Sequence, residues 1–273
     1  MHTIRLPAVA GTFYPGDSPS LASTVVGLLA QARAELPRAT PSPPPKALIV
    51  PHAGYIYSGL IAARAYAQLD GLRHQIRRVV LLGPVHHFAV RGLALPGVSA
   101  FRTPLGELPV DSQAVAELSA LQQVTVSAGA HAMEHSLEVQ LPFLQMVLDD
   151  FELLPLAVGD ATPQEVAQVL EALWGGPETL FVVSSDLSHY MSYASAQQAD
   201  SQTVSRILSL DATLTHTQAC GGTPLNGLLL TARRHDLQAR LLGLCNSGDT
   251  AGDRQRVVGY AAIAFSEPRH AAH

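Results

Sequence analysis

The sequence predicts an α/β fold, a single three-layer α/β/α domain with a mostly parallel central sheet. Short apolar runs without alternation recur along the chain, and such runs are typical of strands that are buried on both faces. Longer stretches with helical periodicity separate these runs, which is the order found in parallel sheets. The chain has 273 residues, of which 47% are hydrophobic. This length and composition are enough for one large domain with a substantial core.

The expected elements alternate along the chain. Apolar runs predict strands at residues 47–50, 78–82, 151–158, 180–183, 238–246 and 257–265. Apolar spacings of three and four residues predict helices at residues 20–36, 58–69, 111–121, 135–148, 162–173, 195–208 and 224–235. Asp17 or Ser18 is a suitable cap for the first helix, and Thr162 for the fifth. Five prolines within residues 37–45 predict a linker before the first strand.

The charged residues exclude several classes of function. Lys46 is the only lysine, against sixteen arginines, and it follows three prolines at the start of a strand. Schiff-base, pyridoxal and P-loop chemistry each need a lysine at the reacting centre, whereas Lys46 is expected at the edge of the sheet opposite a ligand crevice. The net charge is −5 and no arginine cluster exceeds two residues. A nucleic-acid-binding surface is therefore not expected.

The two cysteines are too few for a disulfide framework, and they differ in their surroundings. Cys245 lies in an apolar run and is expected to be a small buried hydrophobic residue. Cys220 precedes two glycines and a predicted helix, where it is either a thiolate favoured by a metal or the helix dipole, or a plain turn residue. The sequence shows neither a secretory leader nor an apolar run of about 18 residues. We expect a soluble, cytoplasmic protein that does not enter a membrane.

Histidines follow three of the predicted strands. His52 comes after the first strand, His86 and His87 after the second, and His189 with Asp186 after the strand at residues 180–183. Ligands of an open α/β sheet bind at the carboxyl ends of its strands, because the loops there converge on one crevice. Several histidines at this edge indicate a metal site or a general acid/base site.

A competing motif occupies residues 131–135. His131, Glu134 and His135 have the H-x-x-E-H spacing of inverted zinc proteases. That mechanism needs both histidines on one helix, but the apolar periodicity begins only at Leu137. His135 is therefore better explained as the entrance to a helix, and a zinc-dependent hydrolase is the weaker alternative.

Taken together, six segments resemble the Memo family. They are residues 10–14, 51–59, 82–87, 134–138, 183–189 and 220–227, which occur in order along nearly the whole chain. The family is similar in fold to class III extradiol dioxygenases, which hold a nonheme iron in a single three-layer α/β/α domain. Its bacterial members resemble protein B of the AmmeMemoRadiSam system.

The resemblance implies a set of site residues. The metal ligands would be the imidazoles of His52 and His86 and the thiolate of Cys220, which takes the place of the dioxygenase carboxylate. Four further residues would form the catalytic pocket: His189 as the acid/base group, Asp186 beside it, and His135 and Tyr55. His87 would be a neighbour of the site rather than a ligand.

The functional expectation is a metal-dependent redox role on an unknown small-molecule or peptide ligand. Iron (Fe²⁺) is the preferred metal, with copper and zinc as alternatives because a thiolate is softer than a carboxylate. One alternative is a non-catalytic binding module that partners a radical-SAM enzyme and an AMMECR-type protein. The other is the zinc-dependent hydrolase.

Overall fold

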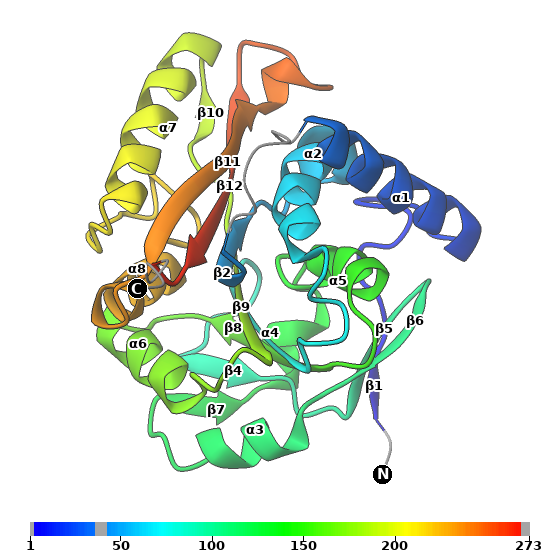
Figure 1. Ribbon diagram of the computed structural model, residues 1–273, viewed down its shortest axis with the longest axis vertical. Coiled ribbons are helices and arrows are strands. Elements are labelled where there is room, and N and C mark those ends of the chain that lie inside the picture. The colour runs from blue at the N-terminus through cyan, green and yellow to red at the C-terminus, as the bar shows by residue number, and fades with distance from the viewer. Residues whose placement is uncertain (1–2, 36–42, 269–273) are drawn as a thin grey trace, which may run out of the picture.

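The computed structural model describes residues 3–35 and 43–268, and its centre is a mixed sheet of nine strands (Figure 1). The strands are β2 (Pro45–Val50), β3 (Arg78–Pro84), β4 (Leu93–Leu95), β7 (Val124–Val126), β8 (Glu152–Val158), β9 (Thr179–Ser184), β10 (His189–Met191), β11 (Gln238–Asn246) and β12 (Val257–Ser266). Their order is β10-β12-β2-β9-β3-β8-β4-β7, and β11 pairs along β12. Most of the predicted linker lies outside the described residues, and Pro45 already belongs to β2.

Four parallel strands form the middle of this sheet, and a further parallel pair, β4 and β7, lies at one edge. β2, β9, β3 and β8 are parallel neighbours. β12 adds to β2 and β4 adds to β8 in antiparallel orientation, so the antiparallel pairs lie on either side. Parallel neighbours need long crossover connections, which helices provide here. The predicted α/β class is therefore confirmed, and its parallel part is the part that positions the strand ends discussed below.

Helices cover both faces of the sheet. The longer ones are α1 (Ser18–Glu35), α2 (Tyr55–Tyr66), α3 (Ser112–Leu118), α5 (Leu141–Val147), α6 (Pro163–Ala172), α7 (Tyr193–Leu208) and α8 (Gly222–Arg234). Figure 1 shows α1, α2 and α5 on one side of the sheet and α6, α7 and α8 on the other. Within the described ranges, no helix has both the length and the apolar character of a membrane span.

Each face of the sheet has its own hydrophobic core. In β2, Leu48 and Val50 belong to the core beneath α1, α2 and α5, whereas Ala47 and Ile49 belong to the core beneath α6 and α8. Successive side chains of a strand point to opposite faces, so a strand between two helix layers needs apolar residues at every position. This is the physical basis of the three-layer arrangement.

The remaining strands and helices are short. A second sheet contains β1 (Ile4–Arg5), β5 (Ala100–Thr103) and β6 (Gly106–Pro109), and short helices occur at α4 (Ala128–Ala132), η1 (Ala67–Leu69), η2 (Glu138–Gln140) and η3 (Ser247–Asp249). The helix expected at residues 135–148 is wrong at its beginning, because η2 starts at Glu138 and regular α-helix only at Leu141. The residues before η2 instead make hydrogen bonds to distant parts of the chain, as described below.

Candidate metal centre

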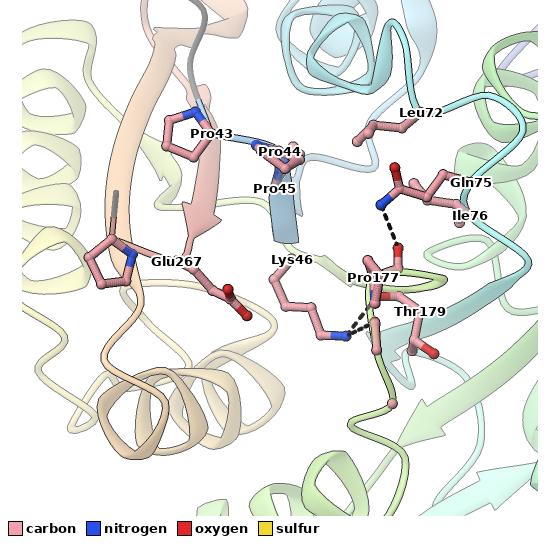
Figure 2. A pocket seen from close by; sticks show the side chains of 13 residues that line it. Pro43, Pro44, Pro45, Lys46, Leu72, Gln75, Ile76, Pro177, Thr179 and Glu267 are labelled. Carbon is pink, nitrogen blue, oxygen red and sulfur yellow. Dashed lines mark hydrogen bonds between the residues drawn. The ribbon is translucent and has the colours of Figure 1, made fainter. Parts of the chain in front are cut away.

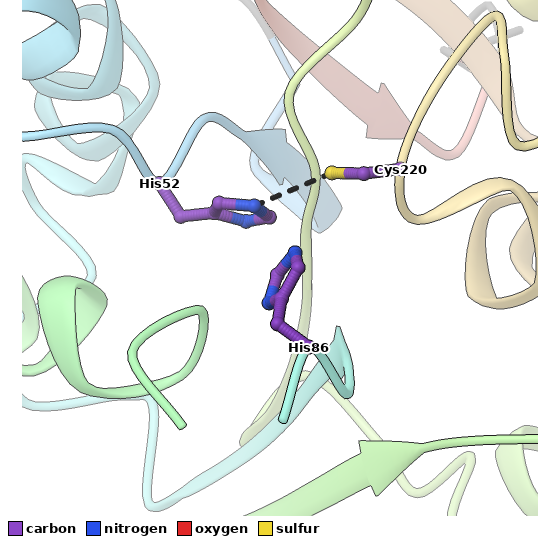
Figure 3. Close-up of side chains that lie close together, drawn as sticks. All are labelled: His52, His86 and Cys220. Carbon is purple, nitrogen blue, oxygen red and sulfur yellow. Dashed lines mark hydrogen bonds between the residues drawn. The ribbon is translucent and has the colours of Figure 1, made fainter. Parts of the chain in front are cut away.

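Three segments bring histidine and cysteine side chains to the carboxyl edge of the parallel strands. His52 follows β2, His86 follows β3, and Cys220 lies just before α8. β2 and β3 are both neighbours of β9, so their carboxyl ends lie close together. In Figure 3 the three side chains come from separate parts of the ribbon and point toward one another.

The spacing of these side chains suits one metal ion. One ligand atom from each of His52, His86 and Cys220 lies within 4.8 Å of the others. The Sγ atom of Cys220 is 3.3 Å from Nε2 of His52. Ligands bound to a transition metal at ordinary bond lengths are separated by about 3–4 Å. These three residues therefore form a group that can hold a metal.

His52 is buried, and only one of its ring nitrogens faces the cluster. Its Nδ1 lies 3.0 Å from Oγ of Ser184, which leaves Nε2 toward Cys220. Its backbone N–H donates to Oδ1 of Asp186 at 2.8 Å. Burial, together with the charges that His86 and His135 would carry, lowers the pKa of His52 well below its ordinary value. His52 is thus neutral at physiological pH, which is the form that binds metals.

His86 is held by a buried carboxylate. Its Nδ1 is 2.9 Å from Oε1 of Glu134, and its backbone N–H donates to Oε2 at 2.6 Å. Burial would raise the pKa of Glu134, but hydrogen bonds from His86 and from the N–H of Ser136 outweigh burial and lower this pKa to about 2. Carboxylates commonly hold the second nitrogen of a metal-binding histidine in this way.

Cys220 is placed by the loop after β9. Its N–H donates to the carbonyl of Asp186 at 3.2 Å, and the N–H of Asp186 donates to Sγ at 3.3 Å. Burial and the nearby Asp186 carboxylate raise the pKa of the Cys220 thiol to about 12. A bound metal ion would supply the positive charge needed to deprotonate this thiol. Two imidazoles and one thiolate are donors that suit iron, copper or zinc, so the residues present fit such an ion.

His135 packs against both imidazole ligands. Its ring stacks on His86 with a centroid distance of 4.7 Å and meets His52 edge-on at 5.5 Å. On another side it contacts Phe13 at 4.8 Å. His135 also forms a second group of potential metal ligands with His86 and Glu134. The ring of the exposed His87 lies 6.1 Å from that of His135, at the rim of the cluster.

His189 and Asp186 lie nearby but are not joined to each other. His189, on β10, is half-buried, and burial together with the charge that His86 would carry lowers its pKa. Within residues 3–35 and 43–268 no hydrogen bond links Asp186 to His189. The Asp186 carboxylate instead accepts from His52, and burial raises its pKa to about 7 although that hydrogen bond opposes the change. Asp186 is thus connected to the predicted ligands.

Tyr55 is directed elsewhere. Its hydroxyl donates to the carbonyl of Val139 at 2.7 Å, and its ring packs against Tyr14 and Phe143. The structure therefore places the Tyr55 hydroxyl in the core of the helical layer and not beside the imidazoles.

The zinc-protease motif does not form the helix that its mechanism needs. α4 ends at Ala132, so His131 and His135 do not share a helical face. Nε2 of His131 lies 2.7 Å from the carbonyl of Ala94, and Glu134 holds His86. The geometry thus gives no support to the hydrolase suggested by this spacing.

Two residues of the site were not singled out from the sequence, and a third, Glu134, was noted in the H-x-x-E-H spacing but not as a partner of His86. Glu134 contacts His86, Ser184 contacts His52, and Gln140 donates to Ser184 at 2.9 Å. Ser184 ends β9, so its position at the strand end was a usable signal. Gln140 lies in η2 and carries no such signal, because only the tertiary fold brings it to the strand ends.

The opposite edge of the sheet holds a cavity of about 430 Å³ (Figure 2). Lys46 lies in its wall and donates hydrogen bonds to the backbone carbonyls of Trp174, Gly176 and Thr179. Burial lowers the pKa of Lys46 to about 8. The expected location of the only lysine, away from the crevice, is confirmed. Its three bonds to carbonyls indicate a structural role.

Comparisons with known proteins lead to the same family as the sequence motifs, over nearly the whole chain. The profile of the Memo family, described as "Memo-like protein", matches residues 5–264. A MEMO1 family protein of Sulfolobus acidocaldarius is 32% identical over 284 residues, which cover 97% of this chain and 100% of that protein. One from Ignicoccus hospitalis is 34% identical over 286 residues, covering 97% and 99%.

A solved structure shares the fold. It is titled as an uncharacterized protein, JW3007, from Escherichia coli K12, and it superposes with a TM-score of 0.52. The match covers 80% of this chain and 98% of that one, at 16% sequence identity. At this identity the likeness shows a common fold alone.

Proposed function

The chain belongs to the Memo family, and we propose that it binds one transition metal ion through His52, His86 and Cys220 for redox chemistry on a small-molecule or peptide substrate. The observation that carries the proposal is the convergence of two imidazoles and one thiol from three separate segments on one point. Two nitrogens and one sulfur leave coordination positions open, as a catalytic site requires. Iron is the preferred ion, with copper and zinc as alternatives.

The chain's own residues would supply the remaining functions. Bound iron or copper would offer electron transfer, whereas zinc would offer only its positive charge at the open positions. His189 lies close enough to His86 for their charges to interact, and it serves as the group that moves a proton to or from the substrate. Asp186 holds the backbone of His52 through its hydrogen bond. His135 and the exposed His87 lie beside the ligands and would contact a substrate bound there.

The metal content of the purified protein tests this function. The wild-type protein, purified without oxygen, should hold close to one ion per chain, and His52→Ala should hold almost none. His74→Ala is the matched control, because His74 is exposed and pairs only with Asp149 in the described part of the chain. Near-zero metal in the wild type under these conditions, even after Fe²⁺, Cu⁺ or Zn²⁺ is added, contradicts the proposal.

A second candidate function is a binding module that partners a radical-SAM enzyme and an AMMECR-type protein. It is favoured by the exposure of three large side chains near the same edge: Ile56 at the start of α2, Phe88 after β3 and Tyr190 on β10. Exposed apolar side chains mark a contact surface when they form one contiguous patch, so this function requires the three to be buried together by a partner. Cys220→Ala separates the two functions, because a pure binding module keeps its affinity for such partners when the metal is lost.

A further inference from the structure

One short segment is linked by hydrogen bonds to both imidazole ligands, directly to His86 and through Ser184 to His52, while it supplies none of the three ligand atoms. This segment, residues 134–140, lies between α4 and α5. At its middle, the N–H of Ser136 donates to Oε1 of Glu134 at 2.8 Å, and the carbonyl of Ser136 accepts from Oγ of Ser184 at 2.6 Å. Glu134 contacts His86 and Ser184 contacts His52. The backbone N–H and C=O of a single residue, Ser136, therefore connect the two partners that hold the two imidazoles.

The proton between His86 and Glu134 belongs to the histidine. The ionised Glu134 carboxylate has lone pairs but no proton to donate. It already accepts the backbone N–H groups of His86 and Ser136, both of which favour the ionised form. In the 2.9 Å hydrogen bond between these residues, Nδ1–H of His86 is thus the donor and Oε1 of Glu134 is the acceptor. In the neutral ring, Nε2 is then left with a free lone pair.

The proton on Ser184 can likewise be assigned. The carbonyl of Ser136 only accepts, so the single hydroxyl proton of Ser184 points to it. The amide of Gln140 is oriented in turn, because its Nε2 donates to the carbonyl of Pro51 at 2.8 Å while its Oε1 accepts from Tyr66. Nε2 of Gln140 therefore donates its second proton to Ser184 at 2.9 Å.

Ser184 then offers His52 only a lone pair. Its Oγ has one proton and two lone pairs, of which the proton and one lone pair are used by Ser136 and Gln140. The remaining lone pair accepts from Nδ1 of His52 at 3.0 Å. His52 therefore carries its proton on Nδ1, and Nε2 faces Sγ of Cys220 with a free lone pair. Both imidazoles therefore carry the proton on Nδ1, His86 because it donates to a carboxylate and His52 because it donates to a hydroxyl.

We propose that Glu134, Ser184 and Gln140 are positioning residues that fix His52 and His86 as Nδ1–H tautomers before any metal binds. The inference rests on the proposed function for its purpose, since a preset Nε2 lone pair is what a metal ion needs. Partners of this kind change metal affinity by about 10–100-fold when they are removed. His52 relies on a neutral hydroxyl and His86 on a carboxylate, so the two ligands lose their orientation through different substitutions.

Nuclear magnetic resonance of the metal-free protein tests the tautomers directly. In protein with ¹⁵N-labelled histidine at pH 8, long-range ¹H–¹⁵N correlations distinguish Nδ1–H from Nε2–H, and His52→Asn and His86→Asn assign the signals. We expect Nδ1–H for both rings. Ser184→Ala should release His52 to the other tautomer or a mixture while His86 stays unchanged. A wild-type His52 with its proton on Nε2, or one that Ser184→Ala leaves as it was, overturns the proposal.

A titration with Co²⁺ alone tests the consequence for affinity. Ser184→Ala and Gln140→Met should each weaken binding by about 10–100-fold, the range known for such partners. Ser58→Ala is the matched control, because Ser58 is also a buried serine and donates only to the carbonyl of Ala53 in the described residues. Equal affinity in all four proteins overturns the positioning role. Expected tautomers without any metal binding in the wild type would instead overturn the proposed function.

Discussion

The hydroxyl of Tyr14 lies 2.6 Å from Oε1 of Glu138, whose side chain is completely buried. The same carboxylate forms an ion pair with Arg5 and accepts two backbone N–H groups from the N-terminal segment. Arg5 also donates to the carbonyl of Glu134 at 2.7 Å. Residues 5–14 are thus attached by hydrogen bonds to the segment at residues 134–140, whose Glu134 contacts His86.

Glu138→Gln should destabilise the protein strongly. Removing one partner of a buried ion pair leaves the other charge without compensation, which costs about 3–5 kcal/mol. Here Arg5 would remain buried beside a neutral amide. Tyr14→Phe removes a single hydrogen bond to a charged group and should cost about 1.5–3 kcal/mol. Urea unfolding followed by circular dichroism measures both. A Glu138→Gln protein no less stable than Tyr14→Phe would show that this ion pair does not hold the segment.

His131 should make the protein sensitive to acid. Its ring is buried, Nε2 donates to the carbonyl of Ala94, and Nδ1 has no partner among the described residues. Burial is the largest cause that lowers the pKa of His131 from 6.5 to about 4. The folded state thus binds this proton less readily than the unfolded chain. The contribution of His131 to the free energy of unfolding is therefore fully present above pH 6.5 and is lost as the pH drops toward 4. The loss amounts to roughly 3 kcal/mol.

Comparison of two variants isolates this effect from the other histidines. His131→Leu cannot titrate, so its free energy of unfolding should fall less than that of the wild type between pH 7 and pH 4. His216→Leu, at an exposed position, should follow the wild-type curve. Parallel curves for the wild type and His131→Leu would mean that His131 keeps an ordinary pKa in the folded protein.

The strands of the parallel centre could be predicted because both of their faces are buried. The apolar run at residues 180–183 lies within β9 (Thr179–Ser184), every residue of which is buried. β4 and β7 have only three residues each, and two of the three residues of β7 are exposed, so neither stands out in the sequence. The predicted start of the helix at residue 135 failed for another reason. Side chains there make hydrogen bonds to distant groups, which apolar spacing does not reveal.

The site residues that follow the ends of strands could be predicted from the sequence. The residues that are attached to them by hydrogen bonds could not. The positions of His52 and His86 after parallel strands were enough to expect them together. The attachment of Gln140 to Ser184 joins residues 44 apart and exists only because the helical layer packs on the sheet. Tyr55 shows the same limit, since its place beside His52 in the sequence does not tell which way its hydroxyl points.

Metal binding should release a proton from Cys220. Burial and the Asp186 carboxylate raise the pKa of this thiol to about 12, so it is protonated at pH 7.5. Only the thiolate binds a metal ion. Calorimetric titration with Zn²⁺ in two buffers of different ionisation enthalpy should therefore show about one proton released per ion. Cys245→Ala, which removes the other thiol, should leave this value unchanged. Tight binding without proton release would exclude Cys220 as a ligand.

Alanine substitutions at two glycines should change the stability of the protein in opposite directions. A Cβ atom on Gly83, in β3, would lie 2.6 Å from Oγ of Ser136, the residue that connects the partners of both imidazoles. Gly83→Ala should therefore displace Ser136, cost about 1–3 kcal/mol of stability and weaken Co²⁺ binding. A Cβ atom on the exposed Gly27, in α1, would meet nothing within 4 Å. Gly27→Ala should stabilise the protein by about 0.5–1 kcal/mol and leave Co²⁺ affinity unchanged. Urea unfolding and Co²⁺ titration of both variants check this. Unchanged Co²⁺ affinity in a folded Gly83→Ala protein would show that the position of Ser136 does not control the ligands.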